Sequence, residues 1–126
     1  MLVLDSSGLS RLGQRTRRAA ALIAALKDAG LWPPIVPTMV LVESTSGAAR
    51  TDATINRFLK TCDVVTEVSE ATARRAGHLR SRAGRGSPVD ALVVAIAEPG
   101  ATVLTSDRRD VEALAAHADH VDVEVV

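Results

Sequence analysis

Short apolar runs alternate with longer amphipathic segments along the entire chain. Five runs, each bounded by polar or turn residues, predict strands at 2–4, 35–36, 63–68, 101–105 and 121–126. Between them, apolar residues at helical spacing predict helices at 6–12, 16–29, 39–49, 51–60, 70–82, 88–97 and 108–118. This alternation favours an α/β fold in which helices cover both faces of a mostly parallel sheet. The length of 126 residues fits one domain, residues 1–126.

The most apolar predicted helix, residues 88–97, carries a single acid, Asp90. Ser87 is suited to cap this helix, and Pro88 to occupy its first position. A carboxylate in such a helix needs a partner, because a buried charge without one is costly. We therefore expect Asp90 to bind a divalent metal ion, together with acids from distant parts of the chain.

Three further acids stand out by their position. Asp5 and Asp107 each follow a predicted strand, and ligands of open α/β sheets bind at the carboxyl ends of the strands. Glu43 follows four consecutive apolar residues in a helix for which Thr38 is the expected cap. Each acid has a structural alternative. Asp5 can cap the next helix, Asp107 can form a capping box with Asp110, and Glu43 can lie on a solvated helix face.

If these acids converge, mutual repulsion will raise the pKa of some of them. A divalent cation removes this conflict, and oxygen ligands favour Mg²⁺, with Mn²⁺ as the alternative, over zinc. His78, His117 and His120 lack the spacing of a zinc site, and the single cysteine, Cys62, excludes a cysteine-rich one. Such an ion would hold a phosphodiester oxygen and lower the pKa of a bound water for attack at phosphorus.

Positive charge is concentrated in arginines, although the formal net charge is zero. One cluster comprises Arg11, Arg15, Arg17 and Arg18, and another comprises Arg74, Arg75, Arg80, Arg82 and Arg85. Because a guanidinium donates two parallel hydrogen bonds to phosphate, these residues can follow a nucleic-acid backbone. The alternative is an ordinary solvated surface. Arg85 and Arg108 are the candidates for binding substrate, although a plain linker is the better interpretation of the glycine-rich loop around Arg85.

Composition excludes several classes of protein. No apolar run approaches the ~20 residues of a membrane span, and residues 1–4 lack the basic leader of a signal peptide. With only one cysteine, these features predict a protein of the reducing cytoplasm that has no membrane partner. Aromatic residues make up 2% of the chain, too few to indicate base stacking. Trp32 lies beside two prolines and can be either a packing residue or an interface anchor.

Four short motifs resemble those of PIN-domain ribonucleases: Val3-Leu4-Asp5-Ser6-Ser7, Val42-Glu43, Pro88-Val89-Asp90-Ala91-Leu92 and Leu104-Thr105-Ser106-Asp107. Their order and the chain length resemble the small single-domain toxins of the VapC type. The resemblance implies a three-layer α/β/α sandwich with a mostly parallel sheet of about five strands. It also implies Mg²⁺-dependent RNA cleavage, a homodimer, and inhibition by a cognate antitoxin.

The same resemblance implies roles for individual residues. Asp5 and Asp90 would be metal ligands and Asp107 would complete the site, while Glu43 would bind the metal or position water. Ser6 and Thr105 match polar positions that support these acids.

The leading hypothesis is therefore an endoribonuclease that acts as the toxin of a toxin–antitoxin pair. One alternative is a non-catalytic PIN-like module that binds RNA or protein. Another is a phosphoacceptor receiver domain, which is disfavoured because no lysine follows Lys60. The sequence leaves open which RNA is cut, whether one or two ions bind, and what Asp110 does. An antitoxin could bind the apolar helix faces at 16–26 and 51–59.

Overall fold

Five parallel strands form one sheet in the order β3-β2-β1-β4-β5 in the computed structural model, which describes all of residues 1–126. The strands are β1 (Leu2–Leu4), β2 (Ile35–Pro37), β3 (Asp63–Val65), β4 (Thr102–Thr105) and β5 (Asp122–Val125). The helices are α1 (Ser6–Gly13), α2 (Arg17–Asp28), α3 (Val40–Ser44), α4 (Ala49–Leu59), α5 (Glu70–Ala83), α6 (Pro88–Ala97) and α7 (Arg108–Ala115). The predicted α/β fold with a five-stranded parallel sheet is confirmed.

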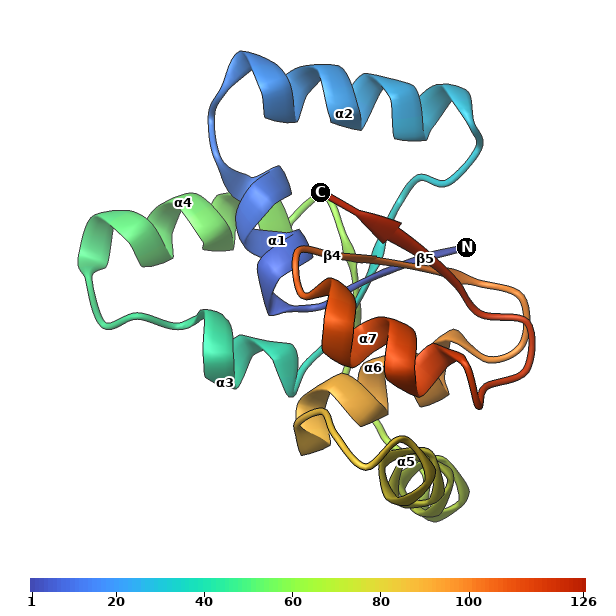
Figure 1. Ribbon diagram of the computed structural model, residues 1–126. Helices are drawn as coiled ribbons and strands as arrows, with labels where there is room; N and C mark the ends of the chain where they lie inside the picture. Colours follow the sequence, from blue (N-terminus) through green and yellow to red (C-terminus); the bar gives the residue numbers. More distant parts are fainter.

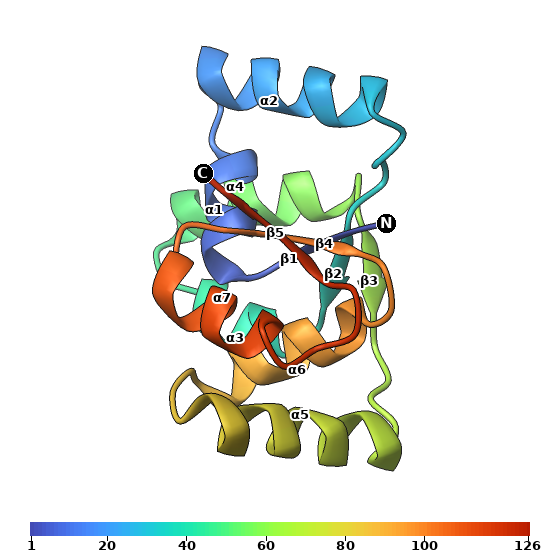
Figure 2. The ribbon, with the colours of Figure 1, turned by 45° about the vertical axis from the view of Figure 1, so that its right-hand side comes forward.

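Helices cover both faces of the sheet. Helices α1, α2 and α4 lie on one side, and α5, α6 and α7 lie on the other, as Figures 1 and 2 show from two directions. Helix α1 packs against both α2 and α4, and α6 packs against both α5 and α7. The chain therefore forms three layers, as predicted. None of the seven helices is long and apolar enough to cross a membrane.

The core is aliphatic and lies around the two central strands and α6. In β1 and β4, Val3, Leu4, Val103 and Leu104 are fully buried, because a parallel sheet covered by helices excludes water from both of its faces. Helix α6 packs against both strands and buries five of its ten residues: Ala91, Val93, Val94, Ala95 and Ala97. The core thus fixes α6, and the acid in its first turn, against the middle of the sheet.

The predicted helix at 39–49 is wrong in length and in its cap. Helix α3 has five residues, and no side chain caps it. Thr38 instead continues the sheet, because its backbone N–H donates to the Val65 oxygen at 2.9 Å. The chain then turns at Ser46 and Gly47, whose backbone N–H groups donate to the Asp52 carboxylate at 2.8 and 2.9 Å. This loop ends α3 at Ser44 and lets α4 begin two residues earlier than predicted.

Trp32 packs within the chain. Its ring makes an edge-to-face contact with Phe58, with ring centroids 6.1 Å apart, and the Lys27 ammonium lies 5.2 Å from the centre of the Trp32 ring. Cys62 is half-buried at the edge of the same core, and burial raises the pKa of its thiol to about 11. This thiol therefore has none of the thiolate character that a reactive cysteine needs.

Candidate metal centre

The carboxyl ends of β1 and β4 bring Asp5 and Thr105 together. The two strands are adjacent and parallel, with Leu4 opposite Leu104, so the residues that follow each strand lie at the same sheet edge. The Thr105 hydroxyl donates to Asp5 Oδ2 across a separation of 100 residues, and Ser7 Oγ donates to Oδ1 at 2.7 Å. Asp5 is 3% exposed. Its carboxylate is therefore held in one orientation at the edge of the sheet.

Asp5 also has the structural role that the sequence offered as an alternative. It is the N-cap of α1, and its Oδ1 accepts the Gly8 N–H at 2.7 Å. A Cβ atom at Gly8 would lie 2.2 Å from the Leu104 carbonyl oxygen. Only glycine therefore lets the first turn of α1 approach β4 this closely, and this approach brings Asp5 toward the end of β4.

The serine hydroxyl that supports Asp5 belongs to Ser7, not to Ser6. The Ser6 side chain makes no hydrogen bond, whereas Ser7 Oγ also accepts the Ser106 N–H at 2.7 Å and lies 3.3 Å from Thr105 Oγ1. A capping side chain faces the second and third residues of its helix, and Ser7 is the second residue of α1. The sequence could have revealed this contact. If Asp5 caps α1, its carboxylate must face Ser7, the second residue of the helix, and not Ser6.

Asp90 forms a capping box at the start of α6. Its backbone N–H donates to Ser87 Oγ at 3.0 Å, and its Oδ2 accepts the Ser87 N–H at 3.1 Å. This role was not predicted, although the spacing Ser87-x-x-Asp90 is that of a capping box in which Asp takes the place of the usual Glu. The other oxygen, Oδ1, accepts no hydrogen bond. Burial raises the pKa of Asp90, and the charges of Asp5 and Asp107 raise it further, although the bonds to Ser87 act in the opposite direction.

Asp107 caps α7 through only half of a capping box. Its Oδ1 accepts the Asp110 N–H at 3.3 Å, but its own N–H donates to Thr105 Oγ1 at 2.9 Å. The Asp110 carboxylate is therefore not used in the box. It joins Asp90 and Asp107, and one carboxylate oxygen from each of the three lies within 4.8 Å of the other two. These three residues are called the acidic triad below.

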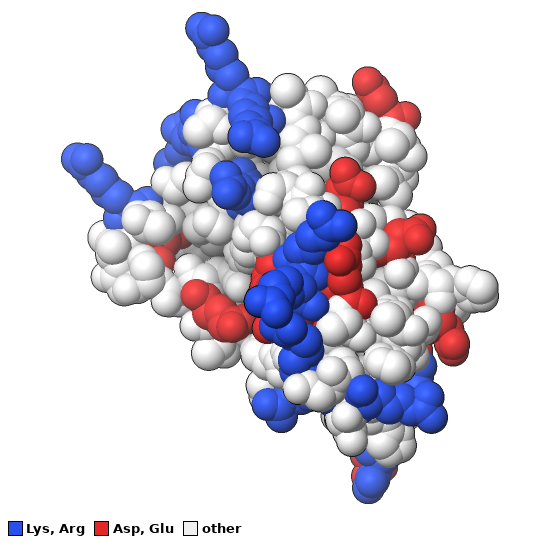
Figure 3. Space-filling view, viewed as in Figure 1, with Lys and Arg blue, Asp and Glu red and all other residues white.

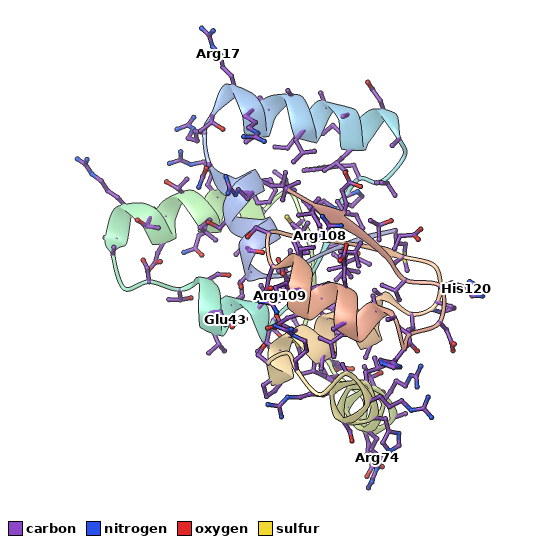
Figure 4. The ribbon with its side chains drawn as sticks, viewed as in Figure 1. Arg17, Glu43, Arg74, Arg108, Arg109 and His120 are labelled. Carbon is purple, nitrogen blue, oxygen red and sulfur yellow. The ribbon has the colours of Figure 1, made fainter.

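The structure places the other two predicted acids differently. Asp5 is not a member of the acidic triad at this spacing, but Thr105 bonds to Asp5 and to the Asp107 backbone and so connects it to the triad. Glu43 is exposed on α3 and makes no hydrogen bond or ion pair (Figure 4). Glu43 therefore lies outside the triad, as the alternative of a solvated helix face predicted. Local sequence did not reveal this position, because the four apolar residues before Glu43 do not show which face of α3 the sheet covers.

The whole arrangement corresponds to a known family. A model of the PIN domain matches residues 2–117, a span that includes every acid described above. The chain belongs to the PIN-domain family. PIN domains are typically metal-dependent nucleases. No curated protein is detectably similar to this chain.

The donor set of this PIN domain fits a hard divalent cation. The acidic triad offers only carboxylate oxygens, and no histidine or cysteine belongs to the group. Oxygen donors of this kind suit Mg²⁺ and Mn²⁺ and do not suit zinc. The pKa of Asp90 is raised first by burial of its carboxyl group and then, to a smaller extent, by the nearby charges of Asp5 and Asp107. A cation among these oxygens would relieve that repulsion.

Arginines lie directly beside the acidic triad of the PIN domain. In Figure 3, Lys and Arg atoms cross Asp and Glu atoms at the middle of the face, over the start of α7. Arg85 Nε pairs with Asp110 Oδ1 at 2.5 Å, whereas Arg108 Nε pairs with Glu112 one turn along α7 at 3.1 Å. Arg109 is exposed and makes no ion pair. The two arginines predicted to bind substrate are thus both engaged with carboxylates.

Proposed function

We propose that this PIN domain is a Mg²⁺-dependent endoribonuclease, with Mn²⁺ as an alternative ion. The observation that supports this most strongly is the acidic triad, in which three carboxylate oxygens lie within 4.8 Å of one another at the edge of the sheet. Asp90, Asp107 and Asp110 would hold the ion, and Asp5 would complete the site from the end of β1. Glu43 receives no ligand role. A bound divalent ion lowers the pKa of a coordinated water and neutralises charge at the phosphate.

The remaining residues orient these groups. Thr105 and Ser7 fix the Asp5 carboxylate, and Thr105 also fixes the Asp107 backbone. A catalytic carboxylate that is held in advance loses no free energy to reorganisation during the reaction. Arg85 and Arg108 lie at the margin of the site and would bind the phosphates that flank the scissile bond. Each guanidinium uses its Nε–H for a carboxylate in the structure, so this particular donor reaches a phosphate only by exchanging its partner.

We also propose that the enzyme is the toxin of a toxin–antitoxin pair and forms a homodimer. The support is the likeness of its motifs and size to VapC-type toxins. A groove between α1, α2 and α4 combines the apolar side chains Leu12, Ile23 and Phe58 with Arg15, Arg17 and Arg57. Such a groove suits an amphipathic segment of a partner protein that carries acidic residues at its margin. The cognate antitoxin would supply that segment.

The direct test is cleavage of RNA by the purified protein. Total RNA should be cut when Mg²⁺ or Mn²⁺ is present and should stay intact in EDTA. The Asp90→Asn and Asp5→Asn variants should lose cleavage while keeping the far-ultraviolet circular dichroism spectrum of the wild type. The matched control is Asp63→Asn, an exposed acid of the edge strand β3, which should cut RNA at the wild-type rate. Mapping the new RNA ends after induced expression would then identify the substrate.

Two outcomes would contradict this proposal. Equal cleavage by the wild type and by both site variants would mean that the site does not carry the activity. A protein that binds RNA but never cuts it, with either ion, would be a non-catalytic binding module. For the toxin role, expression of the wild type should arrest growth and the Asp90→Asn variant should not. Growth arrest by both proteins would remove the link between toxicity and cleavage.

A further inference from the structure

One ion pair joins the acidic triad to a loop on a different element. Of the four ion pairs in the structure, only the pair of Arg85 with Asp110 involves the triad. The side chains of Arg85 and Asp110 are 41% and 27% exposed. Arg85 is therefore the one positive charge that forms an ion pair with a member of the triad. Its guanidinium does for the triad, in part, what a divalent cation would do.

The loop that carries Arg85 has a defined position. It joins α5 to α6, and its glycines Gly84 and Gly86 have φ angles of +67° and +94°, which side-chain-bearing residues rarely adopt. Arg80 Nε donates to the Gly86 carbonyl oxygen at 2.9 Å, and a Cβ atom at Gly86 would lie 2.7 Å from Leu114 Cδ1. The loop is thus fixed to α5 and packed against α7. This geometry directs Arg85 to the triad.

We propose that Arg85 competes with the divalent cation for Asp110, so that the ion must displace an internal counter-ion in order to bind. This inference rests on the proposed metal site. The Oδ1 atom of Asp110 accepts the Arg85 N–H, and a metal ion at the triad needs the same carboxylate. The two cations also repel each other at this short range. Binding of one therefore weakens binding of the other by an equal factor, as linkage requires.

This competition orders the steps at the site. Without the ion, the Arg85 Nε–H is held by Asp110 and is not available to phosphate. After the ion binds, the guanidinium is released beside the triad, where it can donate to a substrate phosphate. Arg85 thus couples occupancy of the metal site to phosphate binding.

The test is calorimetric titration of the purified full-length chain with Mg²⁺ and with Mn²⁺. Arg85→Gln removes the competing charge and should tighten ion binding about fivefold, at the lower end of ordinary coupling between two ligands. The same variant without metal should have a lower Tm than the wild type, because the triad loses its counter-ion. The matched control is Arg109→Gln, which removes an unpaired arginine next to Asp110 and should change ion affinity less than twofold.

A double-substitution cycle separates the effect of the Arg85–Asp110 ion pair on ion affinity from the effect of the Arg85 charge alone. Asp110→Asn should weaken ion binding, and adding Arg85→Gln to this background should tighten it less than Arg85→Gln does in the wild type, because only the direct repulsion between the two cations is then relieved. Tightening by Arg109→Gln equal to that by Arg85→Gln would overturn the inference, as would no tightening by Arg85→Gln when the wild type binds the ion. A wild type that binds neither Mg²⁺ nor Mn²⁺ would overturn the metal site itself, and the inference with it. The two failures are thus distinguishable.

Discussion

Replacing Asp90 by Asn should stabilise the metal-free protein. The substitution removes a negative charge from the acidic triad but leaves an oxygen that can accept the Ser87 N–H of the capping box. Two unit charges 4.8 Å apart, the limit of the triad spacing, repel by about 1 kcal/mol in a water-like medium and by about 3.5 kcal/mol at an effective dielectric constant of about 20. Asp90 is half-buried, and Arg85 already offsets the charge of Asp110.

We therefore expect Asp90→Asn to raise the free energy of unfolding at pH 7 by about 1–2 kcal/mol. For a domain of this size, each kcal/mol corresponds to a rise in Tm of about 4 °C. The measurement is thermal unfolding in EDTA, followed by calorimetry or circular dichroism. Asp63→Asn in β3 is the control, and its free energy of unfolding should stay within about 0.5 kcal/mol of the wild type.

The pH dependence of this effect has a defined sign. Burial and neighbouring charges raise the pKa of Asp90 in the folded protein above its ordinary value of 3.8. The folded state then binds the Asp90 proton more tightly than the unfolded state, so this group destabilises the wild type as the pH rises from 3.8 through the folded pKa. The advantage of Asp90→Asn should be complete at pH 7 and disappear below about pH 4, where both states of the wild type are protonated.

Added ion should reverse the order of stability. Saturating Mg²⁺ stabilises only a protein that binds it, by an amount that grows with the ratio of ion concentration to Kd. The wild type should therefore gain Tm with Mg²⁺, and Asp90→Asn should gain little. A variant that is less stable than the wild type at pH 7 in EDTA would refute the reasoning. It would mean that the contact with Ser87 outweighs the repulsion, and that the triad is not under electrostatic strain.

Three further predictions concern a hydrogen bond to Asp5, the packing of two helix glycines and the reactivity of Cys62. Thr105→Val should cost about 2 kcal/mol of stability in urea unfolding, because it leaves Oδ2 of the buried Asp5 carboxylate without its hydrogen-bond donor, whereas Thr105→Ser should retain most of the stability and cleavage. Gly8→Ala should destabilise by more than about 2 kcal/mol by urea unfolding, because its Cβ would lie 2.2 Å from a β4 carbonyl oxygen. Gly77 lies in α5 with no atom near its missing Cβ, so Gly77→Ala should stabilise the protein by about 1 kcal/mol. Stability changes of the same sign for Gly8→Ala and Gly77→Ala would contradict the close packing of α1 against β4. Alkylation of Cys62 should be slow at pH 8 and accelerate until about pH 11; rapid reaction at pH 8 would show an unperturbed thiol.

The sequence by itself determined the elements that carry most of the site. Apolar runs that end at Asp5 and Ser106 predicted strands with acids after their carboxyl ends, and both strands form. Ser87 and Pro88 predicted the start of α6 and so the place of Asp90. These features are local, because caps and buried strands depend on neighbouring residues and on the exclusion of water from both faces of the sheet.

Tertiary structure alone decided which acids meet. Asp110 joins the triad because Thr105 takes the Asp107 N–H that a complete capping box would have given to Asp110. Glu43 stays outside because it lies on the exposed face of the short helix α3. Each outcome depends on contacts that local periodicity does not encode, above all the pairing of β1 with β4 across about a hundred residues. Local sequence determines which strand end or helix start carries each acid. Strand order and the competition for hydrogen-bond donors determine which of these acids meet.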